Sequence, residues 1–127
     1  MADILLAEDE TVSRDLYQKF LTRAGHKVTG AVDGSAALEA FSQQSFDLVV
    51  TDIYMPDMTG IELIPQLRTK NPDILIIAIS SGGNLKENDL GLGVAKSLGA
   101  HQILEKPFDV KDLVAAVATV LEDGFDT

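Results

Sequence analysis

The sequence predicts an α/β domain built on a doubly wound, five-stranded parallel sheet. Five short aliphatic or β-branched runs lack the polar alternation of half-buried strands, which is typical of strands buried on both faces. Stretches with apolar residues at helical spacing lie between and after these runs, so strands and helices alternate. The 127 residues, 46% of them hydrophobic and 24% charged, suffice for one core but not for two.

The predicted strands are five short apolar runs that stand out along the chain. They cover 4–7, 27–31, 47–51, 74–79 and 102–105. Short connections and right-handed crossovers then favour a single sheet with helices on both faces.

Three of the predicted helices have clear boundaries. The first runs from Val12 to Ala24 and ends at Gly25, because glycine readily terminates a helix. The second begins at Asp33–Gly34. The last carries an apolar stripe over 110–121, with Asp109 as its N-cap.

Two further helices are less regular. One is predicted around 60–70, where Pro65 must lie near the first turn or distort the helix. The other is predicted near 86–98. Gly91 and Gly93 weaken it, each by about 1 kcal/mol relative to alanine.

Composition excludes several classes of function. The net charge of −10 disfavours nucleic acid and anionic membrane surfaces as partners. Without cysteine there is no disulfide, thiolate metal site or cysteine nucleophile. No run is long enough for a membrane span, and the N-terminal apolar run is too short for a signal peptide. We expect a soluble, cytoplasmic protein.

Polar residues follow the predicted strands at their carboxyl ends, where ligands bind in such sheets. They are Glu8, Asp9 and Glu10, Asp52, Ser80 and Ser81, and Lys106. Clustered carboxylates without histidine or cysteine suit Mg²⁺. A cation and a lysine can together neutralise a phosphoryl group in transfer, and a carboxylate beside them can accept it. The pattern indicates phosphoryl transfer to a protein carboxylate.

The motifs at these strand ends resemble the receiver domain of two-component response regulators. Glu8-Asp9 follows the first strand, TDIYMPDMTG at 51–60 is similar to the phosphoacceptor segment, and KPF at 106–108 follows the fifth strand. The resemblance covers nearly the whole chain and implies a flavodoxin-like (βα)₅ fold with strand order 2-1-3-4-5. It further implies a receiver domain over 1–122 and a short tail over 123–127, and we expect no output domain.

The resemblance also implies the site residues. Asp52 is then the phosphoacceptor, and Mg²⁺ is held by Asp9 and Asp52, by Glu8 through water, and by the backbone carbonyl of Tyr54. Ser80 supplies a hydroxyl that moves toward the phosphoryl group, and Lys106 pairs with that group. The Lys106–Pro107 bond is expected to be cis. The implied partners are a histidine kinase or histidine phosphotransfer protein and a downstream protein, and we expect a monomer.

Two positions and one interval of the chain depart from the family pattern. Ile103 occupies the switch position where an aromatic residue is common, so the usual ring rotation cannot operate. Tyr54 places a bulky ring two residues after the acceptor, which predicts slow loss of the phosphoryl group. The interval from Ser80 to Gly99 is about four residues longer than usual, judged against ordinary connection lengths. Its glycines predict that phosphorylation orders residues 82–93.

The sequence also leaves other functions open. One is a constitutive binding module with the same fold and no phosphotransfer. Another is a Mg²⁺-dependent phosphatase, although the second aspartate expected two residues after Asp52 in haloacid-dehalogenase-type enzymes is missing. A Ser80–His101–Asp triad lacks a nucleophile elbow. The run GLGVAK at 91–96 is a poor match to a dinucleotide-binding loop.

Overall fold

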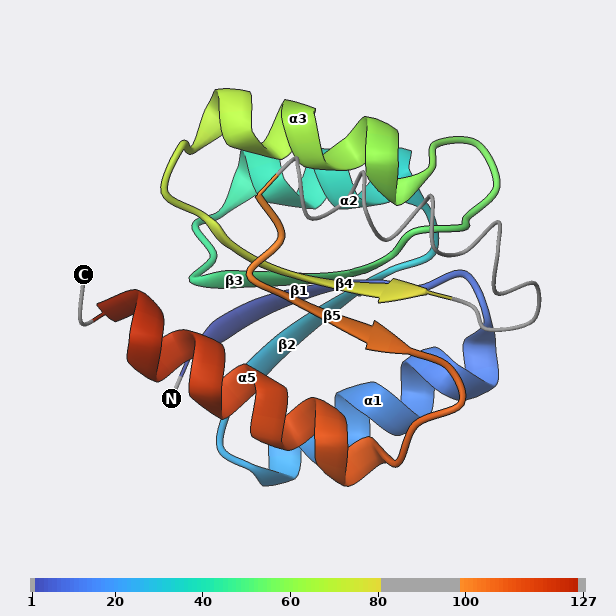
Figure 1. The fold of residues 1–127 in the computed structure, drawn as a ribbon. Helices are drawn as coiled ribbons and strands as arrows, with labels where there is room; N and C mark the ends of the chain where they lie inside the picture. The colour runs from blue at the N-terminus through green and yellow to red at the C-terminus, as the bar shows by residue number, and fades with distance from the viewer. Residues whose placement is uncertain (1, 81–98, 126–127) are drawn as a thin grey trace.

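The computed structural model describes residues 2–80 and 99–125, and Figure 1 shows their arrangement. The predicted helix at 86–98, Ser81 and the ordering of residues 82–93 lie outside these residues. The elements are β1 (Asp3–Ala7), α1 (Thr11–Arg23), β2 (Lys27–Ala31), α2 (Gly34–Gln43), β3 (Leu48–Asp52), α3 (Gly60–Lys70), β4 (Leu75–Ser80), β5 (Gln102–Glu105) and α5 (Val110–Phe125).

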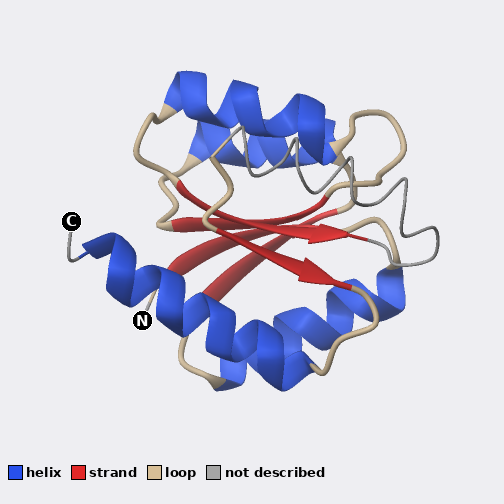
Figure 2. Cartoon of the chain, in the orientation of Figure 1, coloured by secondary structure: helices blue, strands red, loops and turns tan. Residues whose placement is uncertain are grey.

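The five strands form one parallel sheet in the order β2-β1-β3-β4-β5, which confirms the predicted fold class. Helices α2 and α3 cover one face of the sheet, and α1 and α5 cover the other (Figures 1 and 2). Among the described residues, no helix is long and apolar enough to cross a membrane.

The two faces of the sheet belong to two separate cores. In β1, Leu5 and Ala7 pack on the side of α2 and α3, whereas Ile4 and Leu6 pack on the side of α1 and α5. Successive side chains of a strand point to opposite faces, and both faces here are covered. This double burial explains why β1, β3 and β4 show no polar alternation, whereas the outer strands β2 and β5 keep exposed residues.

The helix ends follow local sequence signals. Asp33 accepts a hydrogen bond from the Ala36 N–H at 2.8 Å, and Asp109 accepts one from the Lys111 N–H at 2.9 Å. Gly25 has φ 101°, which ends α1 in the left-handed region that glycine favours. These three boundaries agree with the sequence prediction.

Helix α3 differs from its prediction in one respect. It begins at Gly60, so Pro65 lies in the second turn and not in the first, and the helix nevertheless continues to Lys70. A capping box that the sequence analysis missed holds its start, since Thr59 and Glu62 cap each other's backbone N–H groups. The Thr-x-x-Glu spacing at 59–62 was the signal for it.

Candidate functional site

The carboxyl ends of the parallel strands bring the predicted site residues to one edge of the sheet. Asp52 is the last residue of β3 and Ser80 the last of β4, and Glu8 and Asp9 directly follow β1. Lys106 follows β5, and its backbone N–H donates to the Ser80 carbonyl at 2.8 Å. The sheet therefore gathers these side chains at one edge, as predicted.

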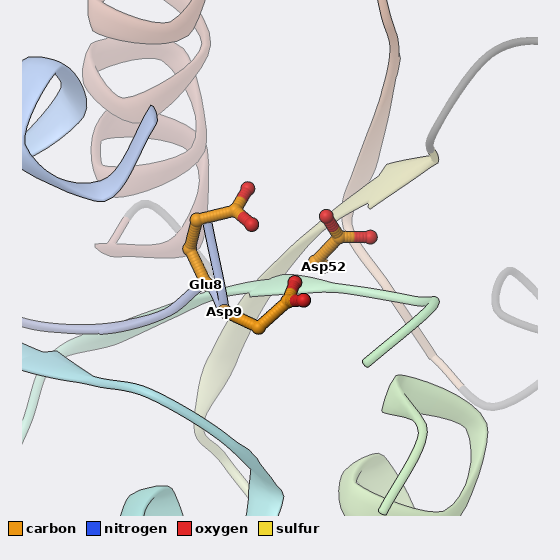
Figure 3. Close-up of side chains that lie close together, drawn as sticks. All are labelled: Glu8, Asp9 and Asp52. Atoms are coloured by element: carbon orange, nitrogen blue, oxygen red, sulfur yellow. The ribbon is translucent and has the colours of Figure 1, made fainter. Parts of the chain in front are cut away.

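Three carboxylates converge at this edge. Glu8, Asp9 and Asp52 each offer an oxygen, and these oxygens lie within 4.8 Å of one another. Figure 3 shows the carboxylates of Glu8, Asp9 and Asp52 close together, and they lie at the carboxyl ends of β1 and β3. Glu8 is 1% exposed and Asp52 2%, whereas Asp9 is exposed. The cluster thus has two buried members and one that is open to solvent.

Lys106 joins the two buried carboxylates. Its Nζ lies 2.9 Å from Oε1 of Glu8 and 3.1 Å from Oδ2 of Asp52, and the side chain is 23% exposed. Although burial acts in the opposite direction, the hydrogen bond to Glu8 and the charge of Asp52 raise the pKa of Lys106 well above its ordinary value. The lysine is therefore held as a cation between the carboxylates.

Burial dominates the protonation of the two carboxyl groups. It raises the pKa of Glu8 and the pKa of Asp52, because a charged carboxylate is poorly solvated there. The ammonium of Lys106 lowers both pKa values and offsets only part of this effect. Three carboxylates meet one ammonium here, so the cluster is short of positive charge when the carboxylates are ionised.

Backbone N–H groups fix the direction of both buried carboxylates. Oδ1 of Asp52 accepts from the Tyr54 N–H at 3.0 Å, which leaves Oδ2 for Lys106. Oε2 of Glu8 accepts from the Glu10 N–H at 3.1 Å. Each carboxylate is thus held by one main-chain donor and by the same lysine.

Ser80 is fully buried, and its Oγ has no hydrogen-bond partner among the residues that the structure describes. A buried hydroxyl left in this state loses its interaction with water without replacement. It lies at the end of β4, next to β3 with Asp52. A hydroxyl in this state is suited to a ligand that brings hydrogen-bonding oxygens.

The other predicted positions lie around this edge. Tyr54 is 41% exposed. Ile103 is half-buried and packs against the core on the side of α2 and α3. The Lys106–Pro107 bond is cis, as predicted, and the Phe108 ring stacks on Tyr17 of α1 with 5.6 Å between ring centroids. The sequence analysis missed this link between α1 and the segment that carries Lys106, because stacking partners distant in sequence leave no local pattern.

The structure contradicts a serine triad. His101 precedes β5, and its backbone N–H donates to Ile76 near the start of β4, whereas Ser80 ends β4. His101 and Ser80 therefore lie at opposite ends of β4. His101 Nδ1 instead accepts the Ile76 N–H at 3.1 Å, which ties the residue before β5 to the start of β4.

Gly60 is a further residue that shapes the site. A Cβ atom at this position would lie 2.7 Å from the carbonyl oxygen of Asp52 and 2.9 Å from Cα of Ile53. The Gly60 N–H donates to the Ile53 carbonyl at 2.7 Å. Only glycine lets α3 start this close to the end of β3.

The donor atoms present fit Mg²⁺. The cluster offers carboxylate oxygens alone, and hard oxygen ligands are the ones that Mg²⁺ prefers. Glu8, Asp9 and Asp52 are the described residues whose carboxylates could hold the ion.

Comparison with known proteins agrees with the fold. Residues 4–118 match the family model described as the response regulator receiver domain. The chain is 35% identical over 121 residues to the response regulator receiver protein CpdR of Brucella abortus, covering 95% of this chain and 98% of that protein. It is 36% identical to the DNA-binding transcriptional regulator NtrC of Azospirillum brasilense, covering 97% of this chain but only 25% of that regulator.

Solved structures give the same result. A CheY-like response regulator receiver domain protein from Methanospirillum hungatei superposes with a TM-score of 0.88 at 25% identity, covering 99% of this chain and 98% of the other. NtrX from Brucella abortus has a TM-score of 0.88 at 30% identity, covering 97% of this chain and 27% of NtrX. Because the family model matches residues 4–118, which are nearly the whole chain, the chain belongs to the response regulator receiver domains.

Proposed function

We propose that this domain accepts a phosphoryl group on Asp52 and signals in a two-component or phosphorelay system. The observation that carries the proposal is the set of groups around Asp52: a carboxylate cluster, a bridging lysine and a buried hydroxyl without a partner among the described residues. The donor would be a histidine kinase or a histidine phosphotransfer protein. The family membership supports this choice of partner.

Asp52 is the nucleophile in this proposal. One of its carboxylate oxygens forms the new O–P bond while the P–N bond to the donor histidine breaks, and the imidazole leaves with its electron pair. The hydrogen bond from the Tyr54 N–H holds Oδ1 in place. Oδ2, which contacts Lys106, shares the ammonium with Glu8, so Lys106 can follow the negative charge as it passes to the phosphoryl oxygens.

Mg²⁺ is the proposed cofactor. Asp9 and Asp52 would hold it directly, Glu8 through water, and the Tyr54 carbonyl would complete the protein ligands. When bound, the ion would supply positive charge that offsets the carboxylates and the incoming phosphoryl oxygens. The cluster of three carboxylates supports this assignment.

Ser80 is proposed to donate its hydroxyl to the phosphoryl group. Its buried Oγ would gain the hydrogen bond that it lacks among the described residues. A hydrogen bond that forms only after phosphorylation shifts the equilibrium toward the conformation in which Ser80 can make it. Ile103 has no ring to rotate, so we propose that the response passes through other parts of the fold to a downstream protein partner.

We also propose the domain organisation, the class of partner and the location in which this function takes place. The likeness to a relative covered over 98% of its length supports a single-domain regulator that acts through protein contacts or as a phosphate shuttle or sink. The net charge of −10 supports protein partners in place of nucleic acid. We propose a cytoplasmic monomer.

A direct test is incubation with Mg²⁺ and acetyl phosphate, followed by intact-mass measurement. The wild type should gain the mass of one phosphoryl group, and Asp52→Ala should gain none. Ser80→Ala should still form the adduct but with a smaller change in amide NMR shifts. A wild type without an adduct, or an Asp52→Ala variant with one, would contradict the proposal.

The same experiment separates the alternative functions. A constitutive binding module would show neither an adduct nor a change in the NMR spectrum. A phosphatase acting on small molecules would release phosphate continuously from a phosphate ester without a lasting adduct. The charges and the buried hydroxyl around Asp52 favour phosphoryl acceptance, because a binding module has no need of them together.

A further inference from the structure

The turn that carries the acidic pair is held by an arginine of the following helix. Nη1 of Arg14, in the first turns of α1, donates to the Glu8 carbonyl oxygen at 2.9 Å. The same nitrogen lies 3.5 Å from the Asp9 carbonyl oxygen, at the outer limit of a hydrogen bond. The guanidinium therefore contacts the main chain of both residues that contribute carboxylates from this turn.

Arg14 contacts the backbone of the acidic turn, whereas Lys106 contacts carboxylates. Within the described part of the chain, Lys106 makes the only ion pairs, and they go to Glu8 and Asp52. The Asp9 carboxylate is the exposed member of the cluster and has no ion pair with a described residue. Its direction therefore depends on the backbone of the turn, and that backbone is what Arg14 contacts.

The neighbouring strand leaves room for this arginine. A Cβ at Gly30 of β2 would lie 3.4 Å from Cδ of Arg14 and 3.7 Å from its Cγ, with Oε1 of Gln18 at 3.1 Å. The stem of Arg14 thus passes over a residue without a side chain. The Arg14 N–H also donates to the Glu10 carbonyl at 2.9 Å, which ties the arginine's own backbone to the same turn.

We propose that Arg14 is a positioning residue for the cation site, which fixes the main chain of Glu8 and Asp9 so that the Asp9 carboxylate is already directed into the cluster. The inference rests on the proposed function, since the direction of Asp9 matters only if the cluster binds a cation. Residues that orient the ligands of a metal typically change its affinity by ten- to a hundredfold when they are replaced.

The test is the Mg²⁺ dissociation constant, measured by titration of amide NMR shifts in the absence of any phosphoryl donor. Arg14→Met keeps an apolar stem over Gly30 and removes the donors, and it should weaken Mg²⁺ binding about tenfold. Arg14→Lys keeps the charge, but its ammonium falls about one bond short of the Nη1 position. It should bind Mg²⁺ with an affinity between those of the wild type and Arg14→Met.

The matched control is Arg23→Met, which removes the same charge from the last turn of α1. It should leave the Mg²⁺ affinity unchanged. A second variant leaves Arg14 intact: Gly30→Val should displace the arginine stem and weaken Mg²⁺ binding by less than the tenfold expected of Arg14→Met. Gly30→Val also keeps the inference testable if Arg14→Met does not fold.

Two results would overturn the inference while leaving the proposed function intact. One is a wild type that binds Mg²⁺ while Arg14→Met and Gly30→Val bind it equally well or more tightly. The other is Arg14→Lys with wild-type affinity beside a weakened Arg14→Met, which would mean that only the charge matters. A wild type that neither binds Mg²⁺ nor forms the Asp52 adduct would instead overturn the proposed function, and the inference with it.

Discussion

Replacing Gly60 by alanine should disturb both the stability of the fold and the phosphoacceptor. The added Cβ would lie 2.7 Å from the Asp52 carbonyl oxygen and 2.9 Å from Cα of Ile53. Both neighbours are main-chain atoms and cannot rotate away. Ordinary contact begins at 3.4 Å, so α3 and the end of β3 must separate by about 0.7 Å.

The size of the effect follows from two opposing terms. Overpacking of this kind costs about 1–3 kcal/mol, and alanine gains up to about 1 kcal/mol over glycine in a helix. We expect a net loss of about 1–2 kcal/mol in the free energy of unfolding. Because misplacing reacting groups by about 1 Å can slow a reaction about a hundredfold, a shift of this size should slow phosphorylation of Asp52 about tenfold.

Two measurements check this prediction. Urea unfolding followed by far-UV circular dichroism gives the stability, and intact mass during incubation with acetyl phosphate gives the rate. The control is Gly30→Ala, whose nearest neighbours are Oε1 of Gln18 and stem atoms of Arg14, both in flexible side chains, and its free energy of unfolding should change by less than about 0.5 kcal/mol. A Gly60→Ala variant as stable and as fast as the wild type would refute the steric reasoning.

Further predictions concern Asp52, Thr59 and Tyr54. Burial raises the pKa of Asp52, so its charge destabilises the fold increasingly as the pH rises above 3.8, the ordinary value. Asp52→Asn should therefore melt at a higher temperature than the wild type at pH 7 without Mg²⁺, and its advantage should shrink as the pH is lowered. Mg²⁺ at ten times its dissociation constant should stabilise the wild type by about 1.4 kcal/mol and Asp52→Asn by less. Thr59→Ala should cost about 1 kcal/mol in urea unfolding, whereas Thr59→Ser keeps the cap. Tyr54→Asn should shorten the lifetime of the phosphorylated protein in a mass time course, because it removes an exposed ring beside the acceptor.

Each of these has a contrary outcome. An Asp52→Asn variant that melts below the wild type at pH 7 would mean that Lys106 more than compensates the buried charge. Equal stabilities of Thr59→Ala and Thr59→Ser would mean that the hydroxyl contributes nothing to α3. An unchanged or longer phosphoryl lifetime in Tyr54→Asn would contradict shielding by the ring.

Local signals made much of this molecule predictable. The five strands agree with their predicted ranges to within one residue at each end. For β1, β3 and β4 the reason is that runs buried on both faces must be continuously apolar. The caps at Asp33 and Asp109 followed from side chains that bond to their own helix start. Pro65 was the exception: local reasoning placed it near the first turn or expected it to distort the helix, but it is an exposed residue of the second turn and α3 continues to Lys70.

The sequence by itself determined which residues end the strands, and the parallel order then brings them to one edge. Only the tertiary structure decided how they meet there: that Lys106 bridges Glu8 and Asp52, that Ser80 Oγ lacks a partner among the described residues, and that Gly60 lies against the Asp52 carbonyl. Residues 8, 52 and 106 are far apart in the chain, so no periodicity encodes their distances. Strand register and the packing of helices on the sheet set those distances, and both depend on the whole core.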